Sequence, residues 1–410
     1  MTIPSPDPFE LVGTTIAGKY DVEEIVAQTA LSVVYRATHR VWQRRVAIKA
    51  FTAPSLSEEA QQQLLASFVE EGRLLMDLSE RCASICQARD VSSLTTHRGE
   101  WVPYTVLEWL DGECLEVLLR REHAEGRSPR SLRAVVELLN PIAEALGVAH
   151  DRGIVHRDVK PGNIFVLSSG AGEAPRTKLL DFGVAKVMRG AVAAPGAVVS
   201  QSFTPSYGAP EQFSAAYGTT GPWTDVYALG LIVVELLTGR EALQGDVLSG
   251  LAAQSCDPHV RPTARTRGAV VTDDVEQVLE RALAVSLEHR FGSARALWAA
   301  LRQALAAERS EAGSEARPAA PAVGPSEALS QAEIHVEWDE PESSAAVDPP
   351  GGGDEGDRDS DMAPSQVDPP PSSDPAGISV GAIALGSTIP IALSRRRIDP
   401  LPPEIPKDST

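Results

Sequence analysis

The sequence predicts an α+β fold, with a small strand-rich part followed by a larger helical part. Three short β-rich runs, separated by turn-like stretches, fall between residues 20 and 51. Beyond residue 112 the apolar residues recur mainly at the three- and four-residue spacing of helices. Strands gathered ahead of helices are typical of α+β domains, because a parallel α/β sheet needs the two to alternate.

The individual elements follow from local patterns. The expected strands cover residues 20–26, 33–37, 45–51 and 102–109. A helix is expected over 58–78, because Leu64, Leu65, Phe68 and Leu75 fall on one side of it. The later helices are expected at 114–121, 131–152, 225–238, 273–284 and 294–307.

Acidic charge is concentrated at the C-terminal end. Residues 310–410 hold 19 acids and 6 bases, so they carry −13 of the net charge of −19. Of the 31 prolines, 16 follow Arg317. We expect residues 308–410 to form a disordered, acidic, proline-rich tail, because they hold too little apolar surface to offset the entropy lost on ordering. The acidic balance argues against nucleic acid or an anionic membrane as the main partner.

Two apolar segments of the tail each allow two interpretations. Ile334, Val336 and Trp338 alternate like a short strand, which could add to the sheet edge of a partner protein. We favour the other interpretation, in which they are a few apolar residues within a disordered tail. Residues 376–393 carry no charge, yet Pro390 and many small residues make their apolar density low. We therefore expect a cytoplasmic chain, with membrane attachment through 376–393 as the minor alternative.

The cysteines indicate reduced thiols. The chain of 410 residues has only Cys82, Cys86, Cys114 and Cys256, and no cluster of histidines accompanies them. So few cysteines in so long a chain do not form a disulfide framework.

Residues 156–163, with the sequence HRDVKPGN, gather groups suited to phosphoryl transfer. Transfer to a hydroxyl needs a carboxylate to accept its proton, an oxygen ligand for Mg²⁺, and positive charge near the phosphate. Asp158, Asn163 and Lys160 supply these on one short loop. A second carboxylate, Asp181, follows in the tripeptide DFG, and Lys49 lies in the predicted strand segment VAIK.

In this order and spacing, the motifs resemble those of the eukaryotic-like (Hanks-type) serine/threonine protein kinases of bacteria. The resemblance covers residues 18–307 and implies the two-lobed protein kinase fold. The N-lobe would span 18–110 and the C-lobe 111–307, with residues 1–17 as a flexible N-terminus. It also implies an enzyme that moves the γ-phosphate of ATP, bound with Mg²⁺, to serine or threonine hydroxyls of unidentified protein substrates.

The resemblance implies a role for each chemical group. Asp158 would be the catalytic base, and Lys160 is the lysine that marks serine/threonine specificity. Asn163 and Asp181 would be the Mg²⁺ ligands. Lys49 would hold the α- and β-phosphates and pair with a helix glutamate, for which Glu71 is the best match and Glu70 the alternative.

The same resemblance places the nucleotide against a loop and a hinge. Leu107 would be the gatekeeper, and the backbone of residues 108–110 would bind adenine. The residues expected to surround the nucleotide, besides the groups named above, are Val26, Ala27, Thr29, Ser32, Val34, Ala47, Glu108 and Leu110.

The resemblance also implies residues that stabilise the fold and residues that regulate the enzyme. Glu211 is expected to form a buried ion pair with Arg290, and Asp225 to brace the catalytic loop. On the activation segment we prefer Ser200 and Ser202 as phosphoacceptors, because Thr204 in this family commonly bonds the catalytic Asp and Lys.

The glycine-rich loop departs from the family pattern, and this keeps a second function open. The three positions that hold glycine in the family are occupied here by Ala27, Thr29 and Ser32. Glycine allows close approach of the backbone to phosphate, so we expect nucleotide binding to be weaker, by about tenfold or about 1.4 kcal/mol. The alternative is a pseudokinase scaffold, and the retention of Lys49, Asp158, Asn163 and Asp181 argues against it. A third hypothesis is that the acidic tail carries the function, as an interaction arm that the kinase domain regulates.

Overall fold

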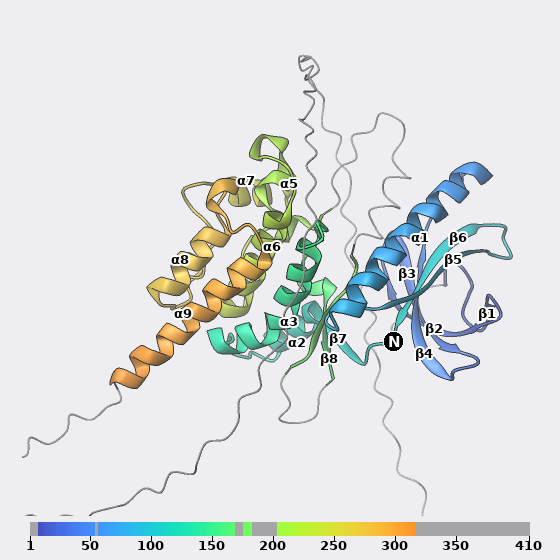
Figure 1. Cartoon of the computed structure of the whole chain (residues 1–410), viewed down its shortest axis with the longest axis horizontal. Helices are drawn as coiled ribbons and strands as arrows, with labels where there is room; N and C mark the ends of the chain where they lie inside the picture. Colours follow the sequence, from blue (N-terminus) through green and yellow to red (C-terminus); the bar gives the residue numbers. More distant parts are fainter. Residues whose placement is uncertain (1–6, 54–55, 169–174, 183–202, 316–410) are drawn as a thin grey trace, which may run out of the picture. The chain divides into compact units, whose positions relative to one another are not determined.

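The computed structural model describes residues 7–53, 56–168, 175–182 and 203–315 (Figure 1). Most strands lie in the first part of the chain and most helices in the second, so the predicted α+β class is confirmed. Within these ranges no helix is long and apolar enough to cross a membrane. The predictions made for Ser200, Ser202, the apolar residues 334–338 and segment 376–393 fall outside the described residues.

The N-lobe is built on one antiparallel sheet with the strand order β1-β2-β3-β4-β6-β5. Because side chains alternate between the two faces of a strand, Tyr35 and Ile48 are buried while their neighbours Val34, Ala47 and Lys49 share the other face. The strands are β1 (Thr15–Ile16), β2 (Tyr20–Gln28), β3 (Ser32–His39), β4 (Arg44–Phe51), β5 (Ala88–Thr95) and β6 (Trp101–Glu108).

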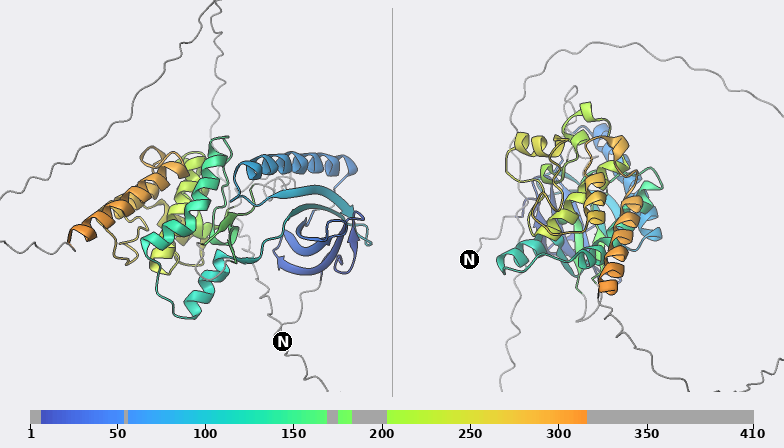
Figure 2. Two further views of the ribbon diagram at one scale, coloured as in Figure 1. Left: turned by 60° about the horizontal axis from the view of Figure 1, so that its bottom comes forward. Right: turned by 90° about the vertical axis from the view of Figure 1, so that its left-hand side faces the viewer.

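One long helix, α1 (Glu58–Arg81), lies along this sheet and packs against β5 (Figures 1 and 2). The hydroxyl of Ser57 caps its first turn by accepting a hydrogen bond from the amide of Ala60 at 3.3 Å. Its buried stripe includes Phe68 and Leu75, as the apolar periodicity predicts. The helix continues beyond the expected end at residue 78.

The packed part of the chain begins near residue 7 rather than at residue 18. Phe9, Leu11 and Ile16 are buried in the N-lobe core. The hydroxyl of Tyr35 donates a hydrogen bond of 2.6 Å to Asp7. The expectation of a flexible segment 1–17 therefore needs correction for residues 7–17, whose apolar side chains belong to the N-lobe core.

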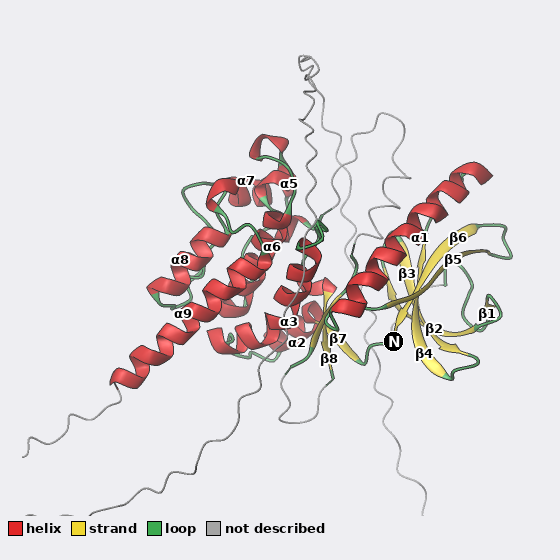
Figure 3. Ribbon diagram, viewed as in Figure 1, coloured by secondary structure: helices red, strands yellow, loops and turns green. Residues whose placement is uncertain are grey.

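The C-lobe surrounds α6 (Pro222–Thr238), which is buried on nearly all sides (Figure 3). Helices α3, α8 and α9 all contact it. The other C-lobe helices are α2 (Leu115–Ala124), α3 (Leu132–His150), α5 (Pro210–Phe213), α7 (Leu248–Cys256), α8 (Asp273–Ala282) and α9 (Ala294–Glu315). A small sheet, in the order β7-β8-β9, is formed by β7 (Gly112–Cys114), β8 (Ile164–Leu167) and β9 (Thr177–Leu179).

A buried ion pair ties α5 to the segment before α9, as the sequence predicts. Nη1 of Arg290 lies 2.9 and 3.2 Å from the two carboxylate oxygens of Glu211, and both side chains are fully buried. Thr224 donates a further hydrogen bond of 2.7 Å to Glu211. Arg290 also donates hydrogen bonds to backbone carbonyls. Together these bonds offset the large free-energy cost of burying the two charged side chains.

Replacing one partner of this pair is expected to destabilise the fold strongly. Arg290→Met leaves the carboxylate of Glu211 buried and unpaired, so we expect a loss of about 3–5 kcal/mol in chemical denaturation. The double variant Glu211→Gln/Arg290→Met should lose less than the single one, because it removes the stranded charge. Arg302→Met, which changes an exposed arginine of α9, is the control. A single variant as stable as the control would contradict the prediction.

Candidate active site

The loop that carries Asp158 is held in place by one buried carboxylate. Asp225, in the first turn of α6, accepts hydrogen bonds from the amides of His156 at 2.8 Å and Arg157 at 2.7 Å. Arg157 adopts a left-handed conformation with φ of 66°, which is unfavourable for a residue with a side chain. Its carbonyl also accepts a hydrogen bond of 2.8 Å from Gln212, so its backbone is fixed on both sides.

Asp225 is itself fixed by His150, at the end of α3. Nδ1 of His150 accepts a hydrogen bond of 3.4 Å from the amide of Ala294, the first residue of α9. The proton of the neutral ring is therefore on Nε2, which donates to Asp225 at 2.9 Å. Sequence reasoning assigned no such role to His150, because nothing in its local pattern points to a contact 75 residues away.

His156 links the same loop to Asp181. Its Nε2 donates a hydrogen bond of 2.8 Å to the carbonyl of Leu180, and its Nδ1 accepts one of 3.3 Å from the amide of Asp158. The ring also packs edge-on against Phe182, with 4.8 Å between centroids. These contacts make His156 a structural support for the loop.

Asp158 and Lys160 meet at Thr204. Oδ1 of Asp158 accepts hydrogen bonds from the amide and the hydroxyl of Thr204, at 3.1 and 2.8 Å. Nζ of Lys160 donates to the same hydroxyl at 2.7 Å and lies 3.0 Å from Oδ2 of Asp158. The carboxylate that would accept a proton is thus oriented beside a fixed positive charge.

Asn163 lies next to Asp158 and has an orientation suited to a cation. Its Nδ2 donates to the backbone carbonyl of Asp158 at 2.8 Å and to the Asp158 side chain at 3.3 Å. The amide oxygen is then the atom left to ligate a metal ion. Together with the carboxylate of Asp181, it provides the hard oxygen ligands that Mg²⁺ prefers, so the donor set fits that ion.

Lys49 reaches across to Asp181 instead of to α1. Its Nζ lies 2.6 Å from Oδ1 of Asp181. Burial alone would raise the pKa of Asp181, but the positive charge and hydrogen bond of Lys49, together with His156 and Lys160, hold that pKa below its ordinary value. The expected contact between Lys49 and Glu71 is not formed in this structure.

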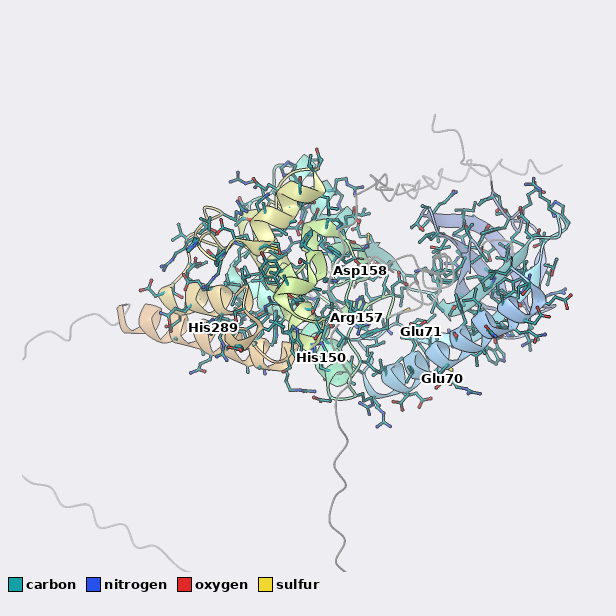
Figure 4. All side chains as sticks on the ribbon, turned by 90° about the horizontal axis from the view of Figure 1, so that it is seen from above. Glu70, Glu71, His150, Arg157, Asp158 and His289 are labelled. Atoms are coloured by element: carbon teal, nitrogen blue, oxygen red, sulfur yellow. The ribbon has the colours of Figure 1, made fainter. Side chains whose placement is uncertain are left out.

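Glu71 nevertheless faces inward on α1, while Glu70 faces outward (Figure 4). Glu70 is exposed and pairs only with Arg73, at 3.4 Å. Oε2 of Glu71 is buried and has no hydrogen-bond partner among the described residues, and burial raises the pKa of Glu71 to about 7. Of the two alternatives that the sequence left open, Glu71 is the one that turns toward the interior of the protein.

The expected gatekeeper and hinge lie at the end of β6. Leu107 pairs with Ala47 across the sheet and lines a small pocket that also contains Lys49 and Asp181. The side chain of Glu108 forms an ion pair with Lys178 of β9 and accepts the amide of Gln87 at 2.9 Å. Glu108 therefore connects the two sheets, a contact that its expected hinge role did not include.

Residues expected around the nucleotide form the adjoining strands. Ala27 of β2 pairs with Val34 of β3, and Val34 pairs with Lys49 of β4. Val26, Ala27, Val34, Ala47 and Leu110 are all half-buried.

The chain matches known proteins over this same region. The family model of the protein kinase domain matches residues 20–300. The serine/threonine-protein kinase Pkn1 of Myxococcus xanthus is 40% identical over 223 residues, which cover 54% of this chain and 30% of that protein. PknL of Mycobacterium bovis is 32% identical over 307 residues, which cover 74% and 69% of the two chains.

A solved structure, the kinase domain of Mycobacterium tuberculosis PknI, is 25% identical with a TM-score of 0.47, covering 71% of this chain and 98% of that one. The chain spans less than two thirds of the length of the first curated relatives, Pkn1 among them. The family model covers more than half of the chain, and PknL is matched over more than two thirds of its length. The chain therefore belongs to the bacterial Hanks-type serine/threonine protein kinase family.

Proposed function

We propose that this chain transfers the γ-phosphate of ATP to serine or threonine hydroxyls of protein substrates. The observation that carries the proposal is the hydrogen-bonded group of Asp158, Lys160, Asn163 and Thr204, with Lys49 and Asp181 beside it. It brings a proton acceptor, two cationic side chains and two oxygen ligands to one region. These are the groups that phosphoryl transfer requires.

Each group then has one task. Asp158 accepts the proton of the substrate hydroxyl at a carboxylate oxygen, and Thr204 fixes the rotation of that carboxylate. Lys160, 3.0 Å from Asp158, places positive charge near the transferred phosphate. Lys49 holds the other phosphates of ATP. Mg²⁺, held by Asn163 and Asp181, would neutralise charge on the phosphate oxygens.

The contact between Lys49 and Asp181 has to open for this arrangement to form. In the structure Lys49 neutralises the carboxylate assigned to the metal, while the buried Oε2 of Glu71 has no hydrogen-bond partner in the described part of the chain. Lys49 would be repelled by a cation held at Asp181 and attracted by a phosphate and by Glu71. Nucleotide loading thus moves Lys49 from Asp181 toward Glu71, which regains a partner.

The alternative function is a pseudokinase scaffold with weak nucleotide binding. Only the glycine-poor loop favours it. The retained polar groups of the site argue against it, because a scaffold has no use for a metal-binding carboxylate such as Asp181, whose burial carries a desolvation cost. An activity assay separates the two functions.

Substitution of the proposed base is the direct test. Asp158→Asn keeps the shape of the side chain but cannot accept the proton, so we expect transfer of labelled phosphate to fall at least about 100-fold. Binding of Mg-ATP should persist. Asp151→Asn, which changes an exposed carboxylate near the same loop, should leave transfer unchanged. A wild-type chain that binds ATP but transfers nothing would support the scaffold instead.

The site of self-modification is a second prediction. After incubation with Mg-ATP we expect phosphate on Ser200 or Ser202. Thr204 should stay unmodified, because its hydroxyl is held between Asp158 and Lys160. Phosphopeptide mapping by mass spectrometry tests this, with Asp158→Asn as the negative control. Phosphate on Thr204, or only on serines of the tail, would reject the assignment.

The unpaired Glu71 predicts a pH dependence. Its pKa is about 7 in the folded chain against an ordinary 4.5, so its contribution to stability is fully present below pH 4.5 and is lost as the pH rises through 7. Relative to Glu71→Gln, the wild type should lose roughly 1–3 kcal/mol between pH 4.5 and 8. Glu70→Gln is the control on the exposed side of α1, and it should show no such trend. Thermal unfolding at several pH values measures the difference, and parallel curves for Glu71→Gln and wild type would refute it.

A further inference from the structure

The tip of the β2–β3 hairpin is closed by the side chain of Thr29. Oγ1 of Thr29 accepts hydrogen bonds from the amides of Ser32 at 3.0 Å and Leu31 at 3.3 Å. It also lies 3.0 Å from the hydroxyl of Ser32. The amide of Thr29 donates in turn to the carbonyl of Ser32 at 2.8 Å.

These bonds use most of the donors at the tip. Of the four amides from Thr29 to Ser32, only that of Ala30 lacks a hydrogen-bond partner within the described part of the chain. The carbonyl of Leu31 accepts the amide of Thr52 at 2.9 Å, which fixes the tip to the end of β4. Thr29 itself is exposed, so its hydroxyl lies where a ligand can reach it.

A hydroxyl oxygen that accepts two successive amides makes the same kind of contact as a phosphate oxygen in a loop that binds phosphate through its backbone. We propose that Thr29 is an internal competitor of the nucleotide triphosphate, whose phosphate oxygens must displace the Thr29 hydroxyl from the amides of Leu31 and Ser32. The proposal rests on the proposed binding of ATP in this cleft.

The hydroxyl, rather than the mere lack of glycine, is then what lowers the affinity for phosphate. Two substitutions separate these causes. Thr29→Val keeps the branched shape and its restricted rotation but removes the acceptor. Thr29→Ser keeps the acceptor and removes the branch. Thr29→Gly would change both at once and is not informative.

The test measures binding of Mg-ATP and of adenosine to the full chain by calorimetry. We expect Thr29→Val to bind Mg-ATP about fivefold more tightly than wild type, the factor that corresponds to one net hydrogen bond of about 1 kcal/mol. Adenosine, which has no phosphate, should bind both chains equally. Thr29→Ser should behave as wild type. In the transfer assay, the KM for ATP should fall in Thr29→Val.

A second readout does not depend on ATP. Amide hydrogen exchange at Leu31 and Ser32 should be faster in Thr29→Val than in wild type, since the Thr29 hydroxyl no longer protects these amides. Unchanged exchange would overturn the proposal, as would a Thr29→Val chain that binds Mg-ATP no more tightly, or that gains equally for adenosine. A wild-type chain that fails to bind ATP but shows the exchange difference would instead remove the proposed function and leave the closed tip standing.

Discussion

The buried carboxylate of Asp225 is the constraint on which the arrangement of the catalytic loop depends. It accepts the amides of His156 and Arg157 and is oriented by His150, so α3, α6 and the start of α9 all meet at the loop. The left-handed conformation of Arg157 persists because both its amide and its carbonyl are bonded. That conformation is of the kind that costs about 1–3 kcal/mol and is found at functional sites. The C-lobe core therefore supplies the free energy that keeps Asp158 in place.

The N-lobe positions its site residue, Lys49, in a different way, through the alternation of side chains along its strands. Since Ile48 faces the N-lobe core, Lys49 must face the opposite side of the sheet, where Asp181 lies within reach. A shift of one residue in the pairing of β3 with β4 would bury Lys49 and expose Ile48. The position of this one cation is thus fixed by the register of the sheet, while that of Asp158 is fixed by the packing of helices.

The sequence predicts those features that depend on local pattern or on motif order. The strands β3 and β4, the apolar stripe of α1 and the pair of Glu211 with Arg290 were all found where expected. Short elements such as β7 and β8 were not predicted, because their few residues gain their stability from neighbouring strands. The partner of Lys49 could not be predicted either. Choosing between Asp181 and Glu71 depends on the placement of α1 to within a few ångströms, which no pattern of residues along the chain encodes.

In this structure, polar groups assigned to ligand binding are already bonded to one another within the chain, and these internal bonds compete with a ligand. Lys49 neutralises Asp181, and the hydroxyl of Thr29 occupies two amides at the loop tip. In the proposed function, a triphosphate with its metal ion would exchange these internal contacts for new ones, so the observed affinity would report only the difference between the two sets. The proposals have the contact at Asp181 broken by any ligand that carries a cation, and the contact at Thr29 broken only by one that carries phosphate. The two contacts therefore lower affinity for different parts of the same ligand, and a nucleoside without phosphate or metal is affected by neither.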